Sequence, residues 1–216
     1  MRKFIGLRAA AAAVALTAVG IGVTATAVHA EATAKKEAKA DAKKGLEIGD
    51  AAPAWKGLEG IDGKKHSLAD LKEAEAVVVV FTCNHCPVAK AYEERLVEFN
   101  NDYKNKKVAL VAINVSNAEA DKLPAMKERG EEQGFEFAYL YDPSQKIGRQ
   151  FGATVTPHAF VIDKERKLAY RGAIDDSQNA AKVTKHSLRD AVDAVLAGKA
   201  PAEPETDQFG CGIGYE

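Results

Sequence analysis

The chain contains little cysteine, little methionine and almost no net charge, and each shortage excludes a class of protein. Three cysteines in 216 residues are too few for a small scaffold held together by disulfides. Its two methionines, Met1 and Met126, provide no methionine-rich copper site. A formal net charge of −1 lacks the positive excess that binds nucleic acid, so we expect no nucleic-acid partner.

The N-terminus has the composition of a secretory signal peptide. Basic residues lie within the first eight positions, and an uncharged, alanine-rich stretch follows from Ala9 to Val28. We predict a signal peptide over residues 1–30, cleaved after Ala30, and therefore a periplasmic or secreted protein that is free of the membrane. The alternative is an uncleaved anchor, because the stretch is nearly long enough to span a bilayer. Its alanine, threonine and glycine content favours cleavage.

Composition divides the rest of the chain into three parts. Residues 31–45 are a low-complexity Ala/Lys/Glu run without an apolar stripe, which we interpret as a solvated tether. Residues 46–200 contain the apolar patterns of one folded domain. Residues 201–216 form a Pro/Gly-rich, flexible tail that carries Cys211.

The order of apolar patterns predicts an α/β fold. Continuous apolar runs at 77–82 and 108–115 are typical of buried strands. A turn at 62–64 indicates a hairpin before the first of these strands. The remaining segments are listed by type: helices over 86–104, 118–133, 143–151 and 186–197, and strands at 139–141, 159–163 and 168–170. This order predicts a mixed central sheet with helices on both faces and an N-terminal β-hairpin extension.

The most informative segment is Cys83-Asn84-His85-Cys86, which lies between a buried strand and a helix. The free N–H groups and the dipole at a helix N-terminus stabilise a thiolate, the form of cysteine that attacks disulfides. Strand, C-x-x-C and helix in this order are typical of thioredoxin-like proteins. His85 can favour the thiolate of Cys83; the alternative is a solvent-exposed turn residue.

Several segments together resemble a known family. They are GDAAPAW, DGKKHSLADL, VVVVFTCNHCPVAKAYEERL, VTPHAFVID and LAYRGAIDD. They look like the AhpC/TSA–TlpA side of the thioredoxin superfamily. More narrowly, the chain is similar to a peroxiredoxin-like group with an F-x-C-N-H-C-P motif and a C-terminal G-C tail, here Phe209-Gly210-Cys211-Gly212. The resemblance covers residues 46–212 and implies a thioredoxin-like fold.

The resemblance implies a role for each site residue. Cys83 corresponds to the exposed nucleophilic cysteine, and Cys86 to the buried cysteine that resolves the mixed disulfide. Asn84-His85 would tune the redox potential of the pair. Thr156-Pro157 corresponds to a cis-proline loop that binds the partner's backbone; the alternative is an ordinary trans proline. The reactive group would be a Cys83–Cys86 disulfide, with no dissociable cofactor.

Two departures from related patterns matter. Thioredoxins carry a buried aspartate six positions before the first cysteine, but Val77 occupies that position here. The proton acceptor for Cys86 is therefore unidentified. The peroxiredoxin pattern P-x-x-x-T-x-x-C fits neither Cys83 nor Cys86, which disfavours efficient peroxide reduction.

Cys211 keeps several alternatives open. It can form a disulfide with Cys83 or Cys86 as an internal relay or cap, or remain a free thiol or an intermolecular link. We expect no metal site, because zinc needs about four ligands and the C-x-x-C has no second cysteine pair.

These observations predict an exported thiol–disulfide oxidoreductase that acts through the CNHC pair. Its partners would be protein thiols and disulfides or small-molecule ones, with a membrane electron donor as a further candidate. Two alternatives are kept: a peroxiredoxin-like peroxidase, and a non-catalytic chaperone of Cu(I) or of cofactor maturation.

Overall fold

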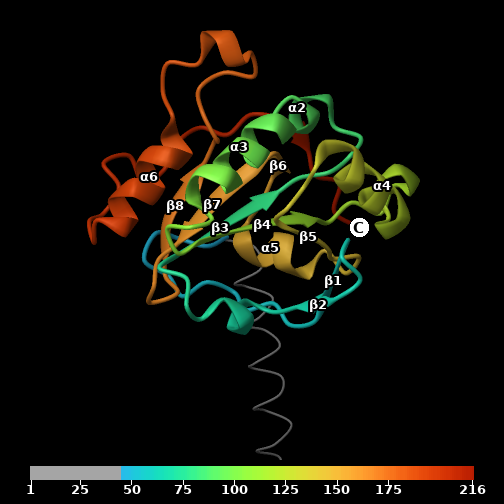
Figure 1. The fold of residues 1–216 in the computed structure, drawn as a ribbon, viewed down its shortest axis with the longest axis horizontal. Helices are drawn as coiled ribbons and strands as arrows, with labels where there is room; N and C mark the ends of the chain where they lie inside the picture. Colours follow the sequence, from blue (N-terminus) through green and yellow to red (C-terminus); the bar gives the residue numbers. More distant parts are fainter. Residues whose placement is uncertain (1–44) are drawn as a thin grey trace, which may run out of the picture. The chain divides into compact units, whose positions relative to one another are not determined.

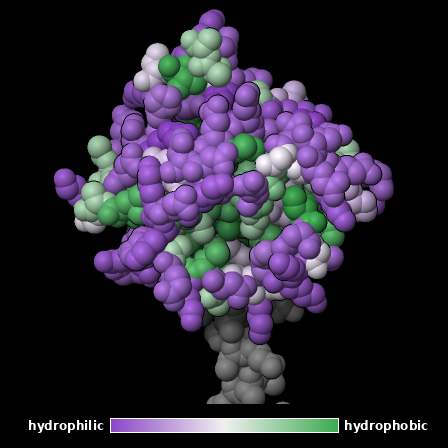
Figure 2. Space-filling model, viewed as in Figure 1, coloured by the Kyte–Doolittle hydropathy of each residue, from purple (hydrophilic) through white to green (hydrophobic). Residues whose placement is uncertain are grey.

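The computed structural model of the protein describes residues 45–216. The predicted signal peptide and residues 31–44 of the predicted tether lie outside the described residues. Within the described part, no helix combines the length and the apolar character needed to cross a bilayer. The face in Figure 2 is mainly hydrophilic, with apolar side chains visible in gaps between polar ones.

Among the described residues, seven strands form one mixed sheet in the order β2-β1-β5-β4-β3-β7-β8 (Figure 1). The strands are β1 (Leu58–Gly60), β2 (Lys65–His66), β3 (Ala76–Phe81), β4 (Val108–Asn114), β5 (Ala138–Tyr141), β7 (His158–Ile162) and β8 (Leu168–Gly172). Strand β3 is parallel to β4 and antiparallel to β7, and β4 is parallel to β5. The predicted mixed sheet with a hairpin at its edge is confirmed.

Helices cover both faces of this sheet. They are η1 (Leu68–Leu71), α2 (Pro87–Lys90), α3 (Glu93–Tyr103), η2 (Glu119–Asp121), α4 (Leu123–Gln133), α5 (Lys146–Phe151), η3 (Ala180–Lys182) and α6 (Ser187–Leu196), where η marks a 3-10 helix. Alternate side chains of a strand face opposite sides. Val78 and Val80 of β3 therefore pack in one core cluster with α3, α4 and α6. Val77, Val79 and Phe81 pack in the other with α5 and η1.

Two predicted helices are each divided in the structure. The helix expected over 86–104 consists of α2 and α3, with a break at Ala91 and Tyr92 that turns the Tyr92 ring inward. Its hydroxyl donates to the buried carboxylate of Asp175 at 2.7 Å, which holds the break. The helix expected over 118–133 consists of η2 and α4, because Lys122 is extended and Pro124 lies in the first turn of α4.

The C-terminal tail is docked and not free, contrary to expectation. Strand β9 (Cys211–Gly212) pairs antiparallel with β6 (Val155–Thr156). The Ile213 N–H continues this pairing by donating to the carbonyl of Thr154 at 2.9 Å. The Tyr215 hydroxyl donates to the carbonyl of Ala153 at 2.7 Å. The tail therefore lies along the segment that leads into Pro157.

Candidate active site

The two cysteines of the CNHC segment lie between β3 and α2. Cys83 is 4% exposed and Cys86 is 0% exposed. Cys86 is the N-cap of α2, and its sulfur accepts a hydrogen bond from the Ala89 N–H at 3.3 Å. The expectation that Cys83 is the exposed cysteine is therefore wrong for this structure, because both side chains are buried. The buried position of Cys86 at the start of the helix is as expected.

Thr156 faces both cysteines, and Pro157 follows it in the chain. The Thr156–Pro157 peptide bond is cis, as expected. The Thr156 hydroxyl lies 3.4 Å from the sulfur of Cys83, and its carbonyl oxygen lies 3.2 Å from the sulfur of Cys86. Thr156 thus contacts both sulfurs, although it lies 73 and 70 residues from the two cysteines in the sequence.

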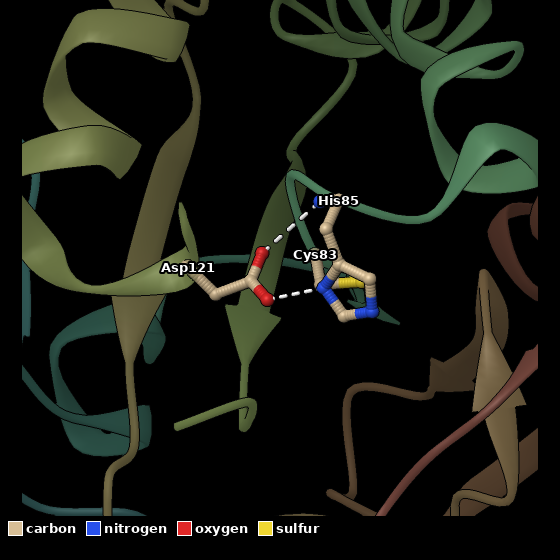
Figure 3. Close-up of side chains that lie close together, drawn as sticks. All are labelled: Cys83, His85 and Asp121. Atoms are coloured by element: carbon tan, nitrogen blue, oxygen red, sulfur yellow. Dashed lines mark hydrogen bonds and ion pairs between the residues drawn. The ribbon is translucent and has the colours of Figure 1, made fainter. Parts of the chain in front are cut away.

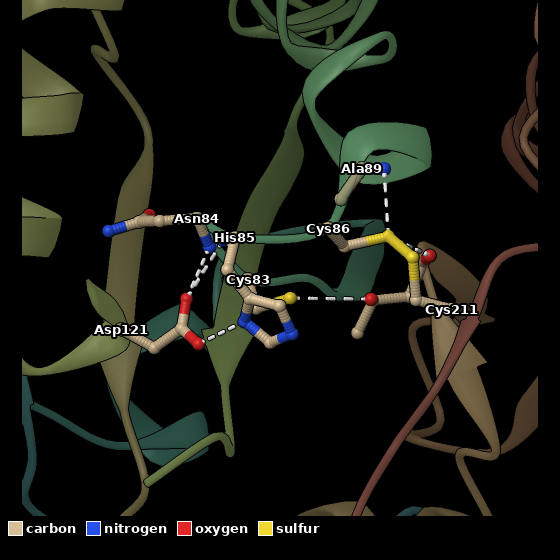
Figure 4. The surroundings of a disulfide bond; sticks show 8 residues. Cys83, Asn84, His85, Cys86, Ala89, Asp121 and Cys211 are labelled. Atoms are coloured by element: carbon tan, nitrogen blue, oxygen red, sulfur yellow. Dashed lines mark hydrogen bonds and ion pairs between the residues drawn. A yellow bond between two sulfur atoms is a disulfide. The ribbon is translucent and has the colours of Figure 1, made fainter. Parts of the chain in front are cut away.

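The structure contains a disulfide between Cys86 and Cys211, here called the tail disulfide, which joins positions 125 apart in the sequence (Figure 4). Cys83 is the free cysteine. Of the alternatives left open for Cys211, the structure therefore contains the bond to Cys86, and the expected Cys83–Cys86 disulfide is absent from these described residues. The reason is the β6–β9 pairing, which places Cys211 opposite Thr156 and beside Cys86.

Burial raises the pKa of the Cys83 thiol above its ordinary value. A hydrogen bond with the Thr156 hydroxyl lowers this pKa, and the negative charge of Asp121 raises it. The net effect is a raised pKa, which corrects the expectation of a thiolate stabilised by a helix N-terminus. Cys83 in this state is a buried thiol that needs a proton acceptor before it can attack a disulfide.

His85 is exposed, but its ring is not free. Half of its side chain is accessible, at 52%, while Nδ1 is bonded to the carboxylate of Asp121, which is 0% exposed (Figure 3). The same carboxylate accepts the N–H groups of Asn84 at 2.7 Å and His85 at 3.1 Å. The sequence left two interpretations of His85, an exposed turn residue or a residue that favours the thiolate of Cys83. The structure shows in addition that the ring is bonded to Asp121.

Asn84 is buried and bonds the CNHC loop to η2 and β5. Its side chain donates to the carbonyl of Ala120 at 2.9 Å and accepts from the Tyr139 hydroxyl at 2.9 Å. The residue is 7% exposed. Its position therefore fixes the loop against η2 and β5, and its predicted effect on the redox potential stays a prediction.

Sequence reasoning missed Asp121. It lies in η2, in the segment that follows β4, at the carboxyl end of a strand parallel and adjacent to β3. Functional side chains gather at this end of parallel strands. Acidic residues shortly after the second apolar run, at 108–115, are therefore the sequence signal that would have indicated Asp121.

Cys83, His85 and Asp121 are also the types of residue that bind metal ions. One potential ligand atom from each lies within 4.8 Å of the others. However, the carboxylate is already bonded to two N–H groups and to the ring of His85, so the hydrogen bonds account for the cluster. Three donors are also fewer than the four that a structural zinc site uses. We interpret the group as a hydrogen-bonded network.

A cavity of about 230 Å³ opens beside the free thiol. The C-terminal tail forms one wall of this cavity and the loop after β4 forms another. Its lining includes Cys83, His85, Asn117, Thr156 and Glu216. A small molecule in this cavity would therefore contact the free thiol while the tail is still docked.

The strand, CNHC loop, helix and facing cis-proline define a thioredoxin-like oxidoreductase. The family model described as Redoxin matches residues 47–191, and the chain belongs to this family. The chain is 30% identical over 129 residues to the thiol-disulfide oxidoreductase ResA of Bacillus thuringiensis (strain Al Hakam). The match covers 60% of this chain and 70% of the relative. The predicted enzyme class, a thioredoxin-like thiol–disulfide oxidoreductase, is confirmed.

Two solved structures are similar over most of the chain. The crystal structure of an uncharacterized conserved protein from Geobacillus kaustophilus is 38% identical, with a TM-score of 0.75, and the match covers 80% of this chain and 94% of the other. A hypothetical protein from Sinorhizobium meliloti 1021 is 35% identical, with a TM-score of 0.73, over 79% and 95% of the two chains. The predicted thioredoxin-like fold is confirmed.

Proposed function

We propose that this protein is an exported oxidoreductase that exchanges disulfides through three cysteines, Cys83, Cys86 and Cys211. The observation that carries the proposal is the grouping of all three around Thr156, with one disulfide and one free thiol. A disulfide with a free thiol beside it is the starting arrangement for internal exchange. Export is supported by the signal-like composition of residues 1–30.

The first step is an internal exchange without net oxidation. The thiolate of Cys83 attacks the sulfur of Cys86 and forms a Cys83–Cys86 disulfide. The electron pair of the broken S–S bond goes to Cys211, which leaves as a thiolate and takes up a proton. Cys86 can accept either partner because only two residues separate it from Cys83, while the tail places Cys211 beside it.

The second step transfers oxidation to a substrate dithiol. One substrate thiolate attacks the sulfur of Cys83, and Cys86 leaves as a thiolate. The second substrate thiolate then attacks the substrate sulfur of this mixed disulfide and releases Cys83. The substrate gains a disulfide and the protein gains two thiols; the reverse sequence reduces a substrate disulfide.

The docked tail separates two classes of substrate. Strand β9 occupies the edge of β6 beside Pro157, where a partner's backbone was expected to bind. A small thiol or disulfide can use the cavity beside Cys83 while β9 is in place. A protein substrate, or a membrane electron donor, would pair with Thr156 after β9 leaves. Peroxide reduction and Cu(I) binding are outcomes that the following experiment separates from exchange.

The test compares Cys83→Ser, Cys86→Ser and Cys211→Ser with the unchanged protein. Redox titration against glutathione, insulin reduction and peroxide consumption are measured in parallel, and non-reduced peptides are mapped after alkylation. We expect Cys86→Ser to lose exchange by at least about 100-fold, because it removes the sulfur common to both disulfides. Cys83→Ser should lose exchange through the Cys83–Cys86 disulfide and keep the tail disulfide. Cys211→Ser keeps exchange but shows a Cys83–Cys86 disulfide. Undiminished exchange in Cys86→Ser, or rapid peroxide turnover, would overturn the proposal. Stoichiometric Cu(I) uptake without exchange would favour the chaperone.

A further inference from the structure

Asp121 places a fully buried carboxylate against the CNHC loop. Burial of a charged group is costly unless hydrogen bonds or an opposite charge compensate it. Two of its partners are the backbone N–H groups of Asn84 and His85, at 2.7 Å and 3.1 Å. The third is Nδ1 of His85, the partner that can become a cation. The side chain of Asp121 therefore has a built position beside the reactive loop.

The contact with Asp121 determines how the imidazole of His85 is protonated. A carboxylate only accepts hydrogen bonds, so Nδ1 carries the proton and Nε2 is left as an acceptor. The sulfur of Cys83, a ring nitrogen of His85 and an oxygen of Asp121 all lie within 4.8 Å of one another (Figure 3). A single water molecule can bridge such a separation. His85 also lines the cavity at Cys83, where a substrate would arrive.

The titratable groups that face Cys83 leave one suitable base. The negative charge of Asp121 opposes formation of a second anion beside it, and the other carboxylate in the cavity lining is Glu216. Burial raises the pKa of Tyr139 well above its ordinary value, so its phenol stays neutral. His85 is the group whose protonation adds positive charge beside the sulfur.

We propose that Asp121 is a positioning residue that holds His85 as the proton acceptor for the Cys83 thiol. The S–H bond of Cys83 breaks, its electron pair stays on sulfur, and the proton moves to Nε2 of His85. The imidazolium then lies close to two anions, the thiolate and the carboxylate of Asp121. When Cys83 later leaves from a disulfide, the same nitrogen returns the proton. The inference rests on the proposed exchange function, since it names the base of the same site.

The experiment measures how fast iodoacetamide alkylates Cys83 as a function of pH. The oxidised protein is suited to it, because the tail disulfide leaves Cys83 as the free thiol. The variants are Asp121→Asn and His85→Gln, and Asp142→Asn is the matched control. Asp142 is also buried, at 2%, but caps α5 by accepting the Ile147 N–H at 2.9 Å. This control reports the effect of removing a buried carboxylate elsewhere.

We expect alkylation at neutral pH to fall by about 100-fold in Asp121→Asn and His85→Gln, the lower end of what a general base contributes. The rates should converge with that of the unchanged protein at alkaline pH, where the thiol ionises unaided. Asp142→Asn should follow the unchanged protein throughout. A purely electrostatic role for Asp121 predicts the opposite sign, because removal of its negative charge would favour the thiolate and speed alkylation.

Equal or faster alkylation in Asp121→Asn at neutral pH would overturn the inference. If Asp121→Asn does not fold, His85→Gln decides alone, because its half-exposed side chain is replaced without disturbing a core; an unchanged rate in that variant overturns the inference as well. Disulfide exchange is assayed on the same samples. Absent exchange in the unchanged protein, with an altered alkylation profile in the two variants, contradicts the proposed function alone. Normal exchange in the unchanged protein, with unchanged alkylation profiles in the variants, contradicts the positioning role alone.

Discussion

His158, directly after the cis-proline, should make the protein less stable in acid. Its ring is 3% exposed, and Nε2 has no hydrogen-bond partner among the described residues. Burial, with a smaller contribution from the charge of Arg171, lowers the pKa of His158 from 6.5 to about 4. The folded protein therefore keeps this ring neutral at a pH where the unfolded chain protonates it.

The sign and size of the effect follow from this difference in pKa. Below pH 6.5 the unfolded state binds a proton that the folded state does not, so acid favours unfolding. The stabilisation is complete above pH 6.5 and is lost as the pH falls toward about 4. The full difference corresponds to about 3 kcal/mol of unfolding free energy. This is a substantial part of the total stability of a single domain, typically about 5–15 kcal/mol.

The assay is urea denaturation of the disulfide-intact protein at several pH values across that window, for the unchanged protein and His158→Phe. Phenylalanine keeps an aromatic ring against Phe160 but cannot be protonated. The variant should lose about 3 kcal/mol less than the unchanged protein between the two ends of the window. His186→Gln, at an exposed histidine, should keep the full acid loss. Parallel stability curves for His158→Phe and the unchanged protein would refute the argument.

Two further predictions concern a close backbone approach at Gly210 and a buried ion pair at Glu93. In Gly210→Ala the new Cβ would lie 2.2 Å from the carbonyl oxygen of Thr156, so β9 must shift. Such overpacking costs about 1–3 kcal/mol. It should therefore lower the equilibrium constant for forming the tail disulfide, measured against glutathione, by about 5- to 150-fold. Gly212→Ala, with open space around its Cβ, is the control and should change nothing; equal values for both variants would contradict the close approach. Arg129→Met should destabilise the protein by about 3 kcal/mol, because it leaves the buried carboxylate of Glu93 without its ion pair. The Glu93→Gln, Arg129→Met double variant should recover more than half of this loss in denaturant titrations.

Local pattern was sufficient for the parts of the fold that depend on neighbouring residues. The buried strands were predicted because β3 and β4 are continuous apolar runs, and the hairpin because its turn residues are adjacent. The cis-proline was predicted from the resemblance to thioredoxin-like proteins. For the strands and the hairpin, the signal and the structure lie within a few residues of each other.

The parts that sequence reasoning missed depend on contacts between distant segments. Asp121 contacts His85 from 36 residues away, and nothing near either residue in the sequence indicates that pairing. The break at Tyr92 depends on Asp175, 83 residues away. The choice of Cys211 as the partner of Cys86 depends on the pairing of a two-residue strand, which is too short to give a periodic pattern.

The three sulfurs have different surroundings, and the differences suit different steps of exchange. Cys83 has a candidate base within reach but little exposure, so it suits internal attack. Cys211 lies in the partly exposed tail, so an external thiol reaches it more readily than Cys86. Attack at Cys211 expels Cys86, whose thiolate keeps the hydrogen bond from the Ala89 N–H that stabilises a leaving group. Cys86 is therefore the sulfur common to both possible disulfides, and its loss should abolish both, whereas loss of either partner leaves the other bond able to form.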